Sequence, residues 1–282
     1  MPDLVPRYYQ HDGIDACRMG VRHGHKRIIL QSPTGSGKTE MAMMLIQEAL
    51  AKRSKIAFIV DRLSILYQTE QRFDSHGIDF GVLQSGHYRF RPYEHLQLCS
   101  SQTLARRGIM DGLDLIIVDE AHTLYKSTVE FIKRHPEIIV IGLTATGFTR
   151  GLGSIYSHVV NVSTTSKLIE EGWLVPLKAY AAKRVSLEGV KTMHDGEWEE
   201  AEVTKRSMEI VGDVVEEWIA KTSQHFGGPV KTLVFSNSVA HGEELCRQYQ
   251  AQGHNFQQIS YKDGNDDSRR AKIEEFRTDD SE

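Results

Sequence analysis

Short apolar runs alternate with amphipathic or charged segments between residue 28 and about residue 145. Nearly continuous apolar runs are typical of strands that are buried on both faces of a parallel sheet. We predict six such strands, at Ile28–Gln31, Ile56–Val60, Phe80–Leu83, Leu96–Ser100, Leu113–Val118 and Ile138–Leu143. The alternation indicates an α/β fold, a doubly wound parallel sheet with helices on both faces. Right-handed crossovers would then bring the carboxyl ends of the strands to one edge.

The pattern changes after residue 147. Residues 147–165 are rich in Gly, Ser and Thr, which predicts a surface connection, and the polar residues 188–204 predict a loop. Apolar residues then recur at helical spacing, at Met208, Val211, Val215, Trp218 and Ile219. After Gly227-Gly228-Pro229 a second α/β pattern begins, with strands predicted at Val230–Phe235 and Phe256–Ser260 and helices at Val239–Gln250 and Asp267–Phe276.

Composition narrows the classes of protein only slightly. The chain has 282 residues, an ordinary globular composition and a net charge of −4, so no overall basic field favours nucleic acid. A local basic face would be enough for nucleic-acid binding, however. Three scattered cysteines without metal spacing indicate a reducing compartment. Because no signal-peptide core and no apolar span of membrane length is present, we expect a cytoplasmic protein without a membrane partner.

The segment Ser32-Pro33-Thr34-Gly35-Ser36-Gly37-Lys38-Thr39 lies between a predicted strand and a predicted helix. This context makes a phosphate cradle, because loop N–H groups and the helix dipole favour an anion at one point. Lys38 would reach the β- and γ-phosphates, and Thr39 would place a hydroxyl on Mg²⁺. Ser32 stands where the strict phosphate-loop pattern, G-x-x-x-x-G-K-[ST], has its first Gly. The alternative is an ordinary strand–turn–helix that needs glycine only for positive φ.

Two adjacent acids, Asp119 and Glu120, follow the apolar run that ends at Val118. Carboxylates at the end of a buried strand are costly unless a cation or partner is present. Ligands bind at this end of the strands in open α/β sheets. Asp119 would hold Mg²⁺, and Glu120 would polarise the attacking water. The alternative is a turn whose acids are merely solvated.

Seven segments, in order along the chain, resemble the motifs of superfamily 2 helicases and translocases, the DEAD/DEAH-box-like group. Within this group they resemble bacterial and phage DNA-remodelling or restriction-type motors more than RNA-specific DEAD-box proteins. They are Arg7–Gln10 (Q-type motif), Ser32–Thr39 (I), Val60–Gln68 (Ia), Cys99–Leu104 (Ib), Asp119–His122 (the DEAH box), Gly142–Gly147 (III) and Leu233–Asn237 (IV). The resemblance implies a RecA-like ATP-binding lobe at 1–160, a connecting segment at 161–205 and an incomplete second RecA-like lobe at 206–282.

The resemblance also implies roles for individual residues. Lys38, Asp119 and Glu120 would be catalytic, with Thr39 and Asp119 holding Mg²⁺. ATP would be bound by Arg7, Gln10, Thr34, Gly35, Ser36, Gly37, Lys38 and Thr39. A side-chain amide such as that of Gln10 can bond both adenine N6 and N7, and Arg7 can stack on the base. Without the resemblance, we would interpret Gln10 as an ordinary surface residue before a helix. His122, Thr144 and Thr146 would couple the nucleotide state to movement, although threonines are also ordinary at strand ends.

Nucleic acid would be contacted by Arg62, Ser101, Gln102 and Thr103, which we expect on loops of the other sheet rim. Short polar side chains and one Arg suit backbone phosphates. The segment His87–Tyr93 interleaves basic and aromatic residues, which would suit a single strand. It could equally be a loop packed on its own domain.

The chain departs from the family pattern in two places. Gly147 stands where family members often have Pro, and nothing like motifs V and VI follows before Glu282. We therefore expect weak ATP turnover, since motif VI carries the arginine finger of the family, and a protein partner could complete the second lobe. The leading interpretation is an ATP-dependent helicase or translocase acting on nucleic acid, DNA more than RNA. The alternatives are a P-loop NTPase of another class and a non-catalytic module that binds nucleic acid or ATP.

Overall fold

The computed structural model of the protein describes residues 5–60, 63–84, 86–103, 112–180, 186–191, 198–264 and 266–278. Contacts within the chain define two compact units, Met1–Leu177 (unit 1) and Lys178–Glu282 (unit 2). Each unit is described by itself.

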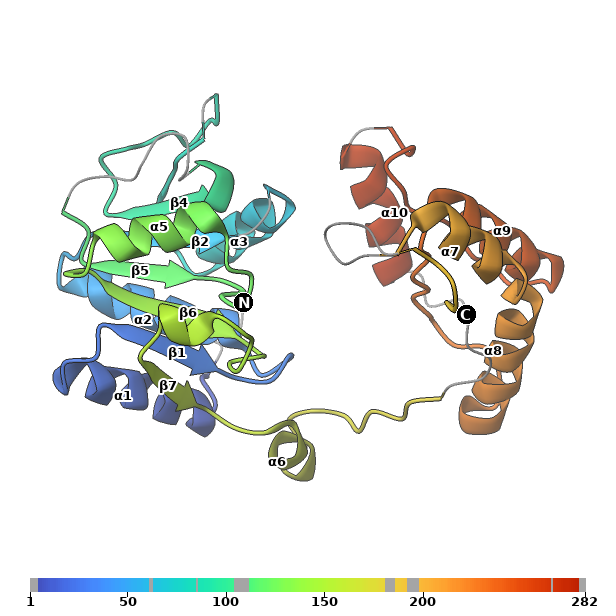
Figure 1. The fold of residues 1–282 in the computed structure, drawn as a ribbon, viewed down its shortest axis with the longest axis horizontal. Helices are drawn as coiled ribbons and strands as arrows, with labels where there is room; N and C mark the ends of the chain where they lie inside the picture. Colours follow the sequence, from blue (N-terminus) through green and yellow to red (C-terminus); the bar gives the residue numbers. More distant parts are fainter. Residues whose placement is uncertain are drawn as a thin grey trace. The chain divides into compact units, whose positions relative to one another are not determined.

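Unit 1 is built around one seven-stranded sheet in the order β3-β4-β2-β5-β6-β1-β7 (Figure 1). All of its pairings are parallel. The strands are β1 (Arg27–Gln31), β2 (Ile56–Val60), β3 (Gly81–Val82), β4 (Leu96–Ser100), β5 (Leu115–Val118), β6 (Ile139–Thr144) and β7 (His158–Asn161). The predicted α/β fold class with a parallel sheet is confirmed.

Helices cover both faces of this sheet. One face carries α1 (Tyr8–Arg22), α2 (Lys38–Ala51) and α3 (Leu63–Ser75), and the other carries α5 (Lys126–Arg134) and a short 3₁₀ turn at Leu152–Ser154. A further short helix, α6 (Thr165–Glu170), follows β7. This division follows from the strands, because successive side chains of a strand point to opposite faces.

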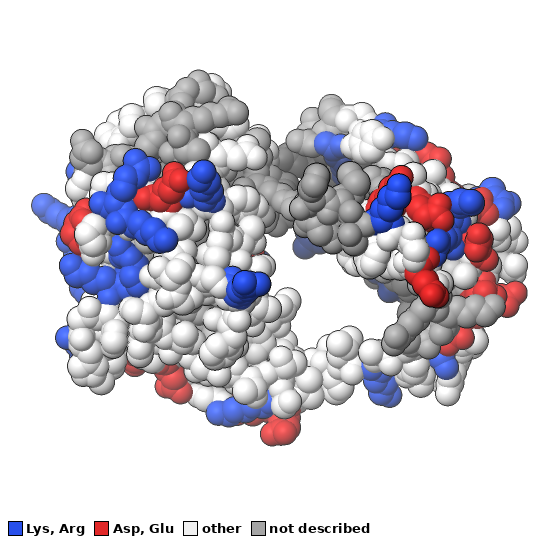
Figure 2. All heavy atoms as spheres, viewed as in Figure 1, with Lys and Arg blue, Asp and Glu red and all other residues white. Residues whose placement is uncertain are grey.

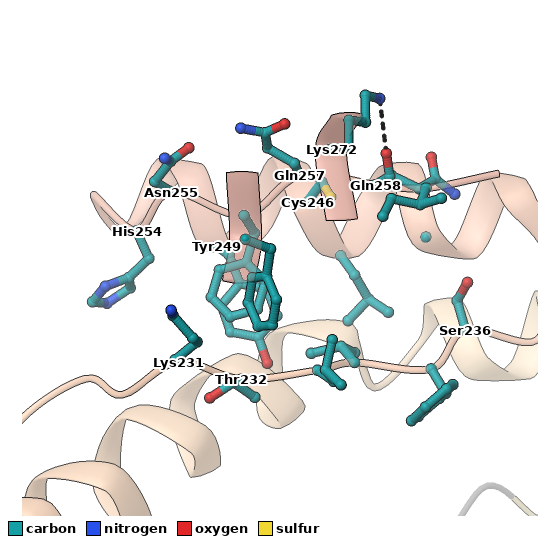
Figure 3. Close-up of a pocket in the computed structure, with 18 of the residues that line it drawn as sticks. Lys231, Thr232, Ser236, Cys246, Tyr249, His254, Asn255, Gln257, Gln258 and Lys272 are labelled. Atoms are coloured by element: carbon teal, nitrogen blue, oxygen red, sulfur yellow. Dashed lines mark hydrogen bonds between the residues drawn. The ribbon is translucent and has the colours of Figure 1, made fainter. Parts of the chain in front are cut away.

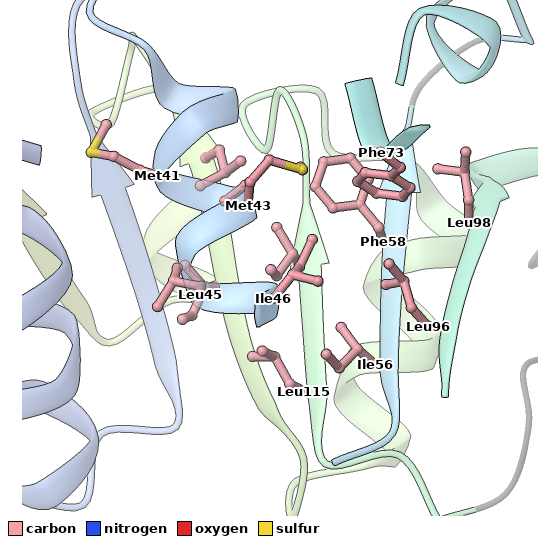
Figure 4. Close-up of a cluster of buried hydrophobic side chains, with 14 of the residues drawn as sticks. Met41, Met43, Leu45, Ile46, Ile56, Phe58, Phe73, Leu96, Leu98 and Leu115 are labelled. Carbon is pink, nitrogen blue, oxygen red and sulfur yellow. The ribbon is translucent and has the colours of Figure 1, made fainter. Parts of the chain in front are cut away.

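The alternation is visible in the two cores of unit 1. Phe58 points to the α2 and α3 side, whereas its neighbours Ala57 and Ile59 point to the α5 side. Figure 4 shows the first core, where Met43 and Ile46 of α2 lie against the strands and Phe73 of α3 lies beside Phe58. Both faces are therefore apolar, as the continuous apolar runs predict.

The sequence missed one strand of unit 1. β7 lies within the predicted surface connection and pairs with β1, from Ile28 opposite His158 to Gln31 opposite Asn161. Only Val160 of its side chains is buried, and its apolar run is limited to Val159 and Val160, which is too short to predict a strand. The strand predicted at Phe80–Leu83 forms over only two residues, as β3.

Unit 2 contains α7 (Glu200–Met208), α8 (Val211–Phe226), α9 (Val239–Ala251) and α10 (Asp266–Thr278). The apolar positions predicted on one helix are thus divided between α7 and α8, and α7 begins inside the predicted polar loop. The strands predicted at Val230–Phe235 and Phe256–Ser260 do not form. Among the described helices of both units, none has the length and apolar character needed to span a bilayer.

The two segments that were predicted as strands line a cavity of about 610 Å³ in unit 2. They lie on opposite sides of it, with Tyr249 between them (Figure 3). Trp218 packs edge-on against Tyr249 and Phe256, with ring centroids 5.2 and 5.4 Å apart. Because neighbouring strands must lie about 4.8 Å apart, segments separated by side chains cannot pair with each other.

We expect Phe73→Ala to lower the unfolding free energy of the protein by about 3–5 kcal/mol, the usual cost of truncating a buried aromatic. Phe73 is fully buried, and its ring lies edge-on to Phe58 and Phe80, with centroids 5.6 and 5.0 Å away. Urea unfolding measures the change. Phe148→Ala is the matched control because Phe148 is 82% exposed, and it should change stability by less than about 0.5 kcal/mol. Equal effects of the two substitutions would contradict this account of the core.

Candidate nucleotide-binding site

Three predicted motif segments leave the sheet at the same edge. The phosphate loop follows β1, Asp119 follows β5, and Ala145 follows β6. These strands are neighbours in the order β5-β6-β1, and all run parallel. Their carboxyl ends therefore meet, with β5 and β1 separated by about 10 Å, two strand spacings. The structure thus brings the glycine-rich loop and the acidic pair together.

The loop between β1 and α2 is held by hydrogen bonds between its own residues. Ser36 donates its backbone N–H to the Pro33 carbonyl at 3.2 Å, and its Oγ lies 2.6 Å from the Oγ of Ser32. Gly35 and Gly37 both have positive φ, +80° and +85°. Ser32 is fully buried, so its hydroxyl fastens the base of the loop at the position where the strict pattern has Gly. Thr34 and Gly35 are exposed at the tip.

Lys38 is the first residue of α2, and Thr39 is the second. The first N–H groups of a helix have no acceptor within that helix, so they are available to an anion. The Lys38 ammonium donates to the carbonyls of Ser32 and Pro33, at 3.3 and 3.5 Å. Its charge therefore lies against the loop, where a phosphate would be bound.

The carbonyl of Ser36 receives two hydrogen bonds from α1. The Tyr9 hydroxyl and the Gln10 amide nitrogen both donate to it at 3.0 Å. Gln10 is only 4% exposed, so its interpretation as a surface residue is wrong. Its amide oxygen accepts from the Arg7 N–H at 2.8 Å. One lone pair and one N–H of this amide remain for a ligand. Tyr9 was missed as a site residue, although it lies inside the Q-type motif.

Arg7 and Gln10 also line a cavity of about 170 Å³ beside the loop. Its other walls come from α2, including Glu40 and Met43, and from His76 after α3. The His76 Nε2 lies 2.8 Å from a Glu40 carboxylate oxygen. This cavity is smaller than the one in unit 2, but it adjoins the phosphate loop and has polar groups on its walls, which a specific ligand site requires.

Asp119 and Glu120 adopt a constrained turn directly after β5. The Asp119 N–H donates to the Ile59 carbonyl at 2.9 Å, and the Glu120 N–H donates to Asp119 Oδ1 at 3.0 Å. Glu120 has a φ of +46°, a left-handed conformation that is uncommon outside glycine. Burial, followed by the charge of Glu120, raises the pKa of Asp119, and Lys38 acts in the opposite direction. A cation at this place would favour the charged carboxylate.

The donors at this edge fit Mg²⁺. Among the described residues, no group of three or more His, Cys, Asp and Glu side chains could enclose a metal ion. Mg²⁺ does not require such a cage, since it is usually held by one or two carboxylates together with substrate phosphates and waters. Asp119 and the hydroxyl of Thr39 supply donors of that kind.

A chain of polar contacts joins the acidic pair to the end of β6. Nδ1 of His122 lies 3.2 Å from Glu120 Oε2 and 3.0 Å from Thr144 Oγ1. Thr144 Oγ1 in turn accepts from the Thr146 N–H at 3.0 Å, and the Thr144 carbonyl accepts from the Ser32 N–H at 3.0 Å. The three residues predicted to couple are thus connected to both Glu120 and the phosphate loop. Their coupling role itself stays a prediction.

Gly147 has a structural reason to be glycine. A Cβ built on it would lie 2.4 Å from Oε1 of Gln31, the last residue of β1. That oxygen is buried and makes no hydrogen bond within the described part of the chain. The buried amide of Gln31 therefore accounts for glycine at residue 147, where members of the family often have Pro.

Of the predicted nucleic-acid residues, Arg62 lies outside the described residues. Ser101, Gln102 and Thr103 form a helical turn directly after β4. Their expected place on the other sheet rim is wrong, because the parallel direction of β4 puts them at the same edge as the phosphate loop. The Ser101 hydroxyl is buried and donates to the Val60 carbonyl at 3.3 Å, whereas Gln102 is exposed.

The loop His87–Tyr93 packs along the edge of the sheet. Arg89 binds Asp74 through two hydrogen bonds of 2.7 and 2.9 Å, and its carbonyl accepts from Val82 of β3. Tyr88 and Tyr93 are each 75% exposed. Arg89 and the loop backbone thus attach the loop to its own domain, while the exposed aromatic residues are Tyr88, Tyr93 and the 47% exposed Phe90.

Basic side chains gather over α5 in Figure 2. The exposed basic residues of this helix are Lys126, Lys133 and Arg134. Lys133 and Arg134 lie in its last turn, where cations complement the helix dipole. Two of the three cations of this basic face therefore also stabilise the end of α5.

The sheet, the phosphate loop and the DEAH segment define a superfamily 2 helicase-like protein. Residues 3–148 match the family described as "Type III restriction enzyme, res subunit". The match covers more than half of the chain, which belongs to this family.

Three curated relatives extend the comparison. The chain is 28% identical to the putative ATP-dependent helicase IRC3 of Saccharomyces cerevisiae, over 91% of the chain and 40% of that protein. It is 27% identical to the type I restriction enzyme EcoAI endonuclease subunit of Escherichia coli, over 86% of the chain and 34% of the subunit. It is 24% identical to a 51.5 kDa protein of a Lactococcus phage, over 80% of the chain and 47% of that protein. The chain thus spans less than half the length of each of these relatives.

Gly37→Ala should weaken the binding of an ATP analogue at least tenfold. A Cβ on Gly37 would lie 2.3 Å from Nε2 of Gln10, so either the loop or the Gln10 amide must move. Isothermal titration calorimetry with a non-hydrolysable analogue measures the change. Gly24→Ala is the control, because its φ of +87° imposes similar backbone strain with no atom within 4 Å. Similar losses of affinity in both variants would mean that backbone strain alone is responsible.

Gly147→Ala should destabilise the protein by about 1–3 kcal/mol, the usual cost of overpacking. Adding Gln31→Ala should recover most of that loss, since the Cβ would then meet no amide. A double-mutant cycle on the unfolding free energy gives the coupling directly. If the two substitutions are simply additive, Gln31 is not the reason for glycine at residue 147.

Proposed function

We propose that this protein is an ATP-dependent helicase or translocase that acts on DNA. The observation that carries the proposal is the joint placement of the phosphate loop and the Asp119–Glu120 turn at one sheet edge, with His122 and Thr144 between them. An ordinary strand–turn–helix does not need that arrangement. The order of the motifs along this chain matches the superfamily 2 pattern.

The binding part of the mechanism belongs to the loop and to α2. The backbone N–H groups of residues 34–39 and the Lys38 ammonium would hold the phosphates of ATP. Thr39 and Asp119 would hold Mg²⁺, which neutralises charge on the phosphates when it is bound. Arg7 and the free valences of the Gln10 amide would receive the base at the adjoining cavity.

The chemical part of the mechanism belongs to Glu120. Its side chain is 41% exposed, so water can reach it, and Nδ1 of His122 lies 3.2 Å from one of its carboxylate oxygens. Glu120 would orient the attacking water and take up its proton. Any shift of His122 on hydrolysis would be transmitted to Thr144 and Thr146 through the contacts described above.

The nucleic-acid part of the proposal rests on the relatives and on position. Two of the relatives are named as a helicase and as a restriction endonuclease subunit. Ser101, Gln102 and Thr103 lie at the same sheet edge as the nucleotide site, where exposed Gln102 could contact a backbone phosphate. We further propose that residues 206–282 belong to a second RecA-like lobe joined to the first by residues 161–205, and that a protein partner contributes to it.

Glu120→Gln should lower ATP turnover by about 10²-fold or more, the range of general acid–base effects, while leaving the affinity for an ATP analogue nearly unchanged. Turnover is measured with and without single-stranded DNA, double-stranded DNA and RNA. Glu130→Gln is the control, since Glu130 lies on α5 with its side chain 54% exposed. Turnover that no nucleic acid stimulates would favour a P-loop NTPase of another class. DNA binding without turnover, unchanged by Glu120→Gln, would favour a non-catalytic module.

A further inference from the structure

The segment that follows α6 is fastened to the end of that helix. Leu168 is fully buried, and its carbonyl accepts hydrogen bonds from both the Trp173 and the Leu174 N–H groups, at 2.8 and 3.0 Å. Gly172, with a φ of +75°, lets the chain turn between them. Trp173 and Leu174 are therefore held in place although Trp173 is 40% exposed.

From this position the segment contacts the start of α1 at three residues, Tyr8, Tyr9 and the N-cap residue Arg7. A carboxylate oxygen of Glu171 accepts a hydrogen bond from the Tyr8 hydroxyl at 2.7 Å. The guanidinium carbon of Arg7 lies 4.7 Å from the centroid of the Trp173 ring, a cation–π contact. The Trp173 ring also lies edge-on to Tyr9, with centroids 6.3 Å apart.

Trp173 thus packs on the two residues that connect the cavity to the phosphate loop. Arg7 Nη1 donates to the Tyr9 hydroxyl at 2.8 Å, and that hydroxyl donates to the Ser36 carbonyl. The guanidinium of Arg7 has five N–H donors, so others remain available at the cavity. The indole ring limits the directions in which this guanidinium can point.

Leu174 lies beside the phosphate loop. A Cβ built on Gly35 would lie 3.0 Å from Cδ2 of Leu174, so the leucine methyl covers the loop at its exposed glycine. Gly35 has a φ of +80°, and its conformation decides where the neighbouring N–H groups point. Leu174 therefore restricts the loop from outside.

We propose that Trp173 and Leu174 are positioning residues of the nucleotide site. Trp173 orients Arg7 on the base side, and Leu174 supports Gly35 on the phosphate side. The proposal rests on the proposed binding of ATP at this site. It assigns a role in nucleotide binding to a segment that lies outside all seven motifs. Neither residue would be catalytic, since both act through other residues.

The two residues should have different signatures in binding experiments. Titration calorimetry with the magnesium complexes of AMP-PNP and of tripolyphosphate separates the base side from the phosphate side. Trp173→Ala should weaken AMP-PNP binding about 3- to 10-fold, as expected for a cation–π contact and the loss of Arg7 orientation, and leave tripolyphosphate binding unchanged. Trp173→Phe should recover part of the loss. Leu174→Ala should weaken both ligands by a similar factor.

Trp198→Ala is the matched control, because Trp198 is 45% exposed, close to the exposure of Trp173, and lies in unit 2. It should bind both ligands as the wild-type protein does. If the wild-type protein binds neither ligand, the proposed function fails. If the wild type binds AMP-PNP and Trp173→Ala binds it equally well, the positioning role is overturned. An equal loss of both ligands in Trp173→Ala and Trp173→Phe would also overturn it, because the residue would then only support the fold.

Discussion

The parallel direction of the strands in unit 1 determines where this protein can carry out chemistry. It gathers the ends of β1, β5, β6 and β4 at one edge, so residues separated by more than a hundred positions become neighbours. Parallel strands require crossover connections that return the chain to the same starting edge, and the helices of these connections bury both faces of the sheet. The parallel direction of the strands therefore places the phosphate loop, the acidic turn and the candidate nucleic-acid residues at the same edge.

At that edge, the backbone carbonyl of Ser36 connects the phosphate loop to α1. Ser36 accepts from both Tyr9 and Gln10, and Arg7 reaches the same group through Tyr9. The loop is therefore held from α1 as well as from β1 and α2. A segment far along the chain, Glu171–Leu174, completes this enclosure through Arg7 and Gly35. The proposed base side and phosphate side of the site are thus parts of one packed unit rather than separate motifs.

The sequence predicts the central strands well because their apolar runs are continuous and long enough to exclude loops. It fails at the edge strand β7, where the only adjacent apolar residues are Val159 and Val160, and in unit 2, where apolar segments line a cavity instead of pairing. For the site, the motif pattern predicts Lys38, Asp119 and Glu120 as catalytic residues, and the structure gathers their segments at one edge. It cannot reveal pairs such as Gln31 with Gly147, or Ser32 with Ser36, because these depend on side-chain contacts between positions with no fixed spacing in the motif.

The left-handed backbone of Glu120 has a consequence for how this site tolerates change. A non-glycine residue in that conformation costs about 1–2 kcal/mol, a strain that the surrounding structure must offset. Glycine at this position would relieve the strain and remove the carboxylate. Stability and the proposed role of Glu120 therefore oppose each other at a single residue, because the backbone strain remains as long as the carboxylate is present. Selection for stability alone would therefore favour loss of the proposed catalytic carboxylate at this residue.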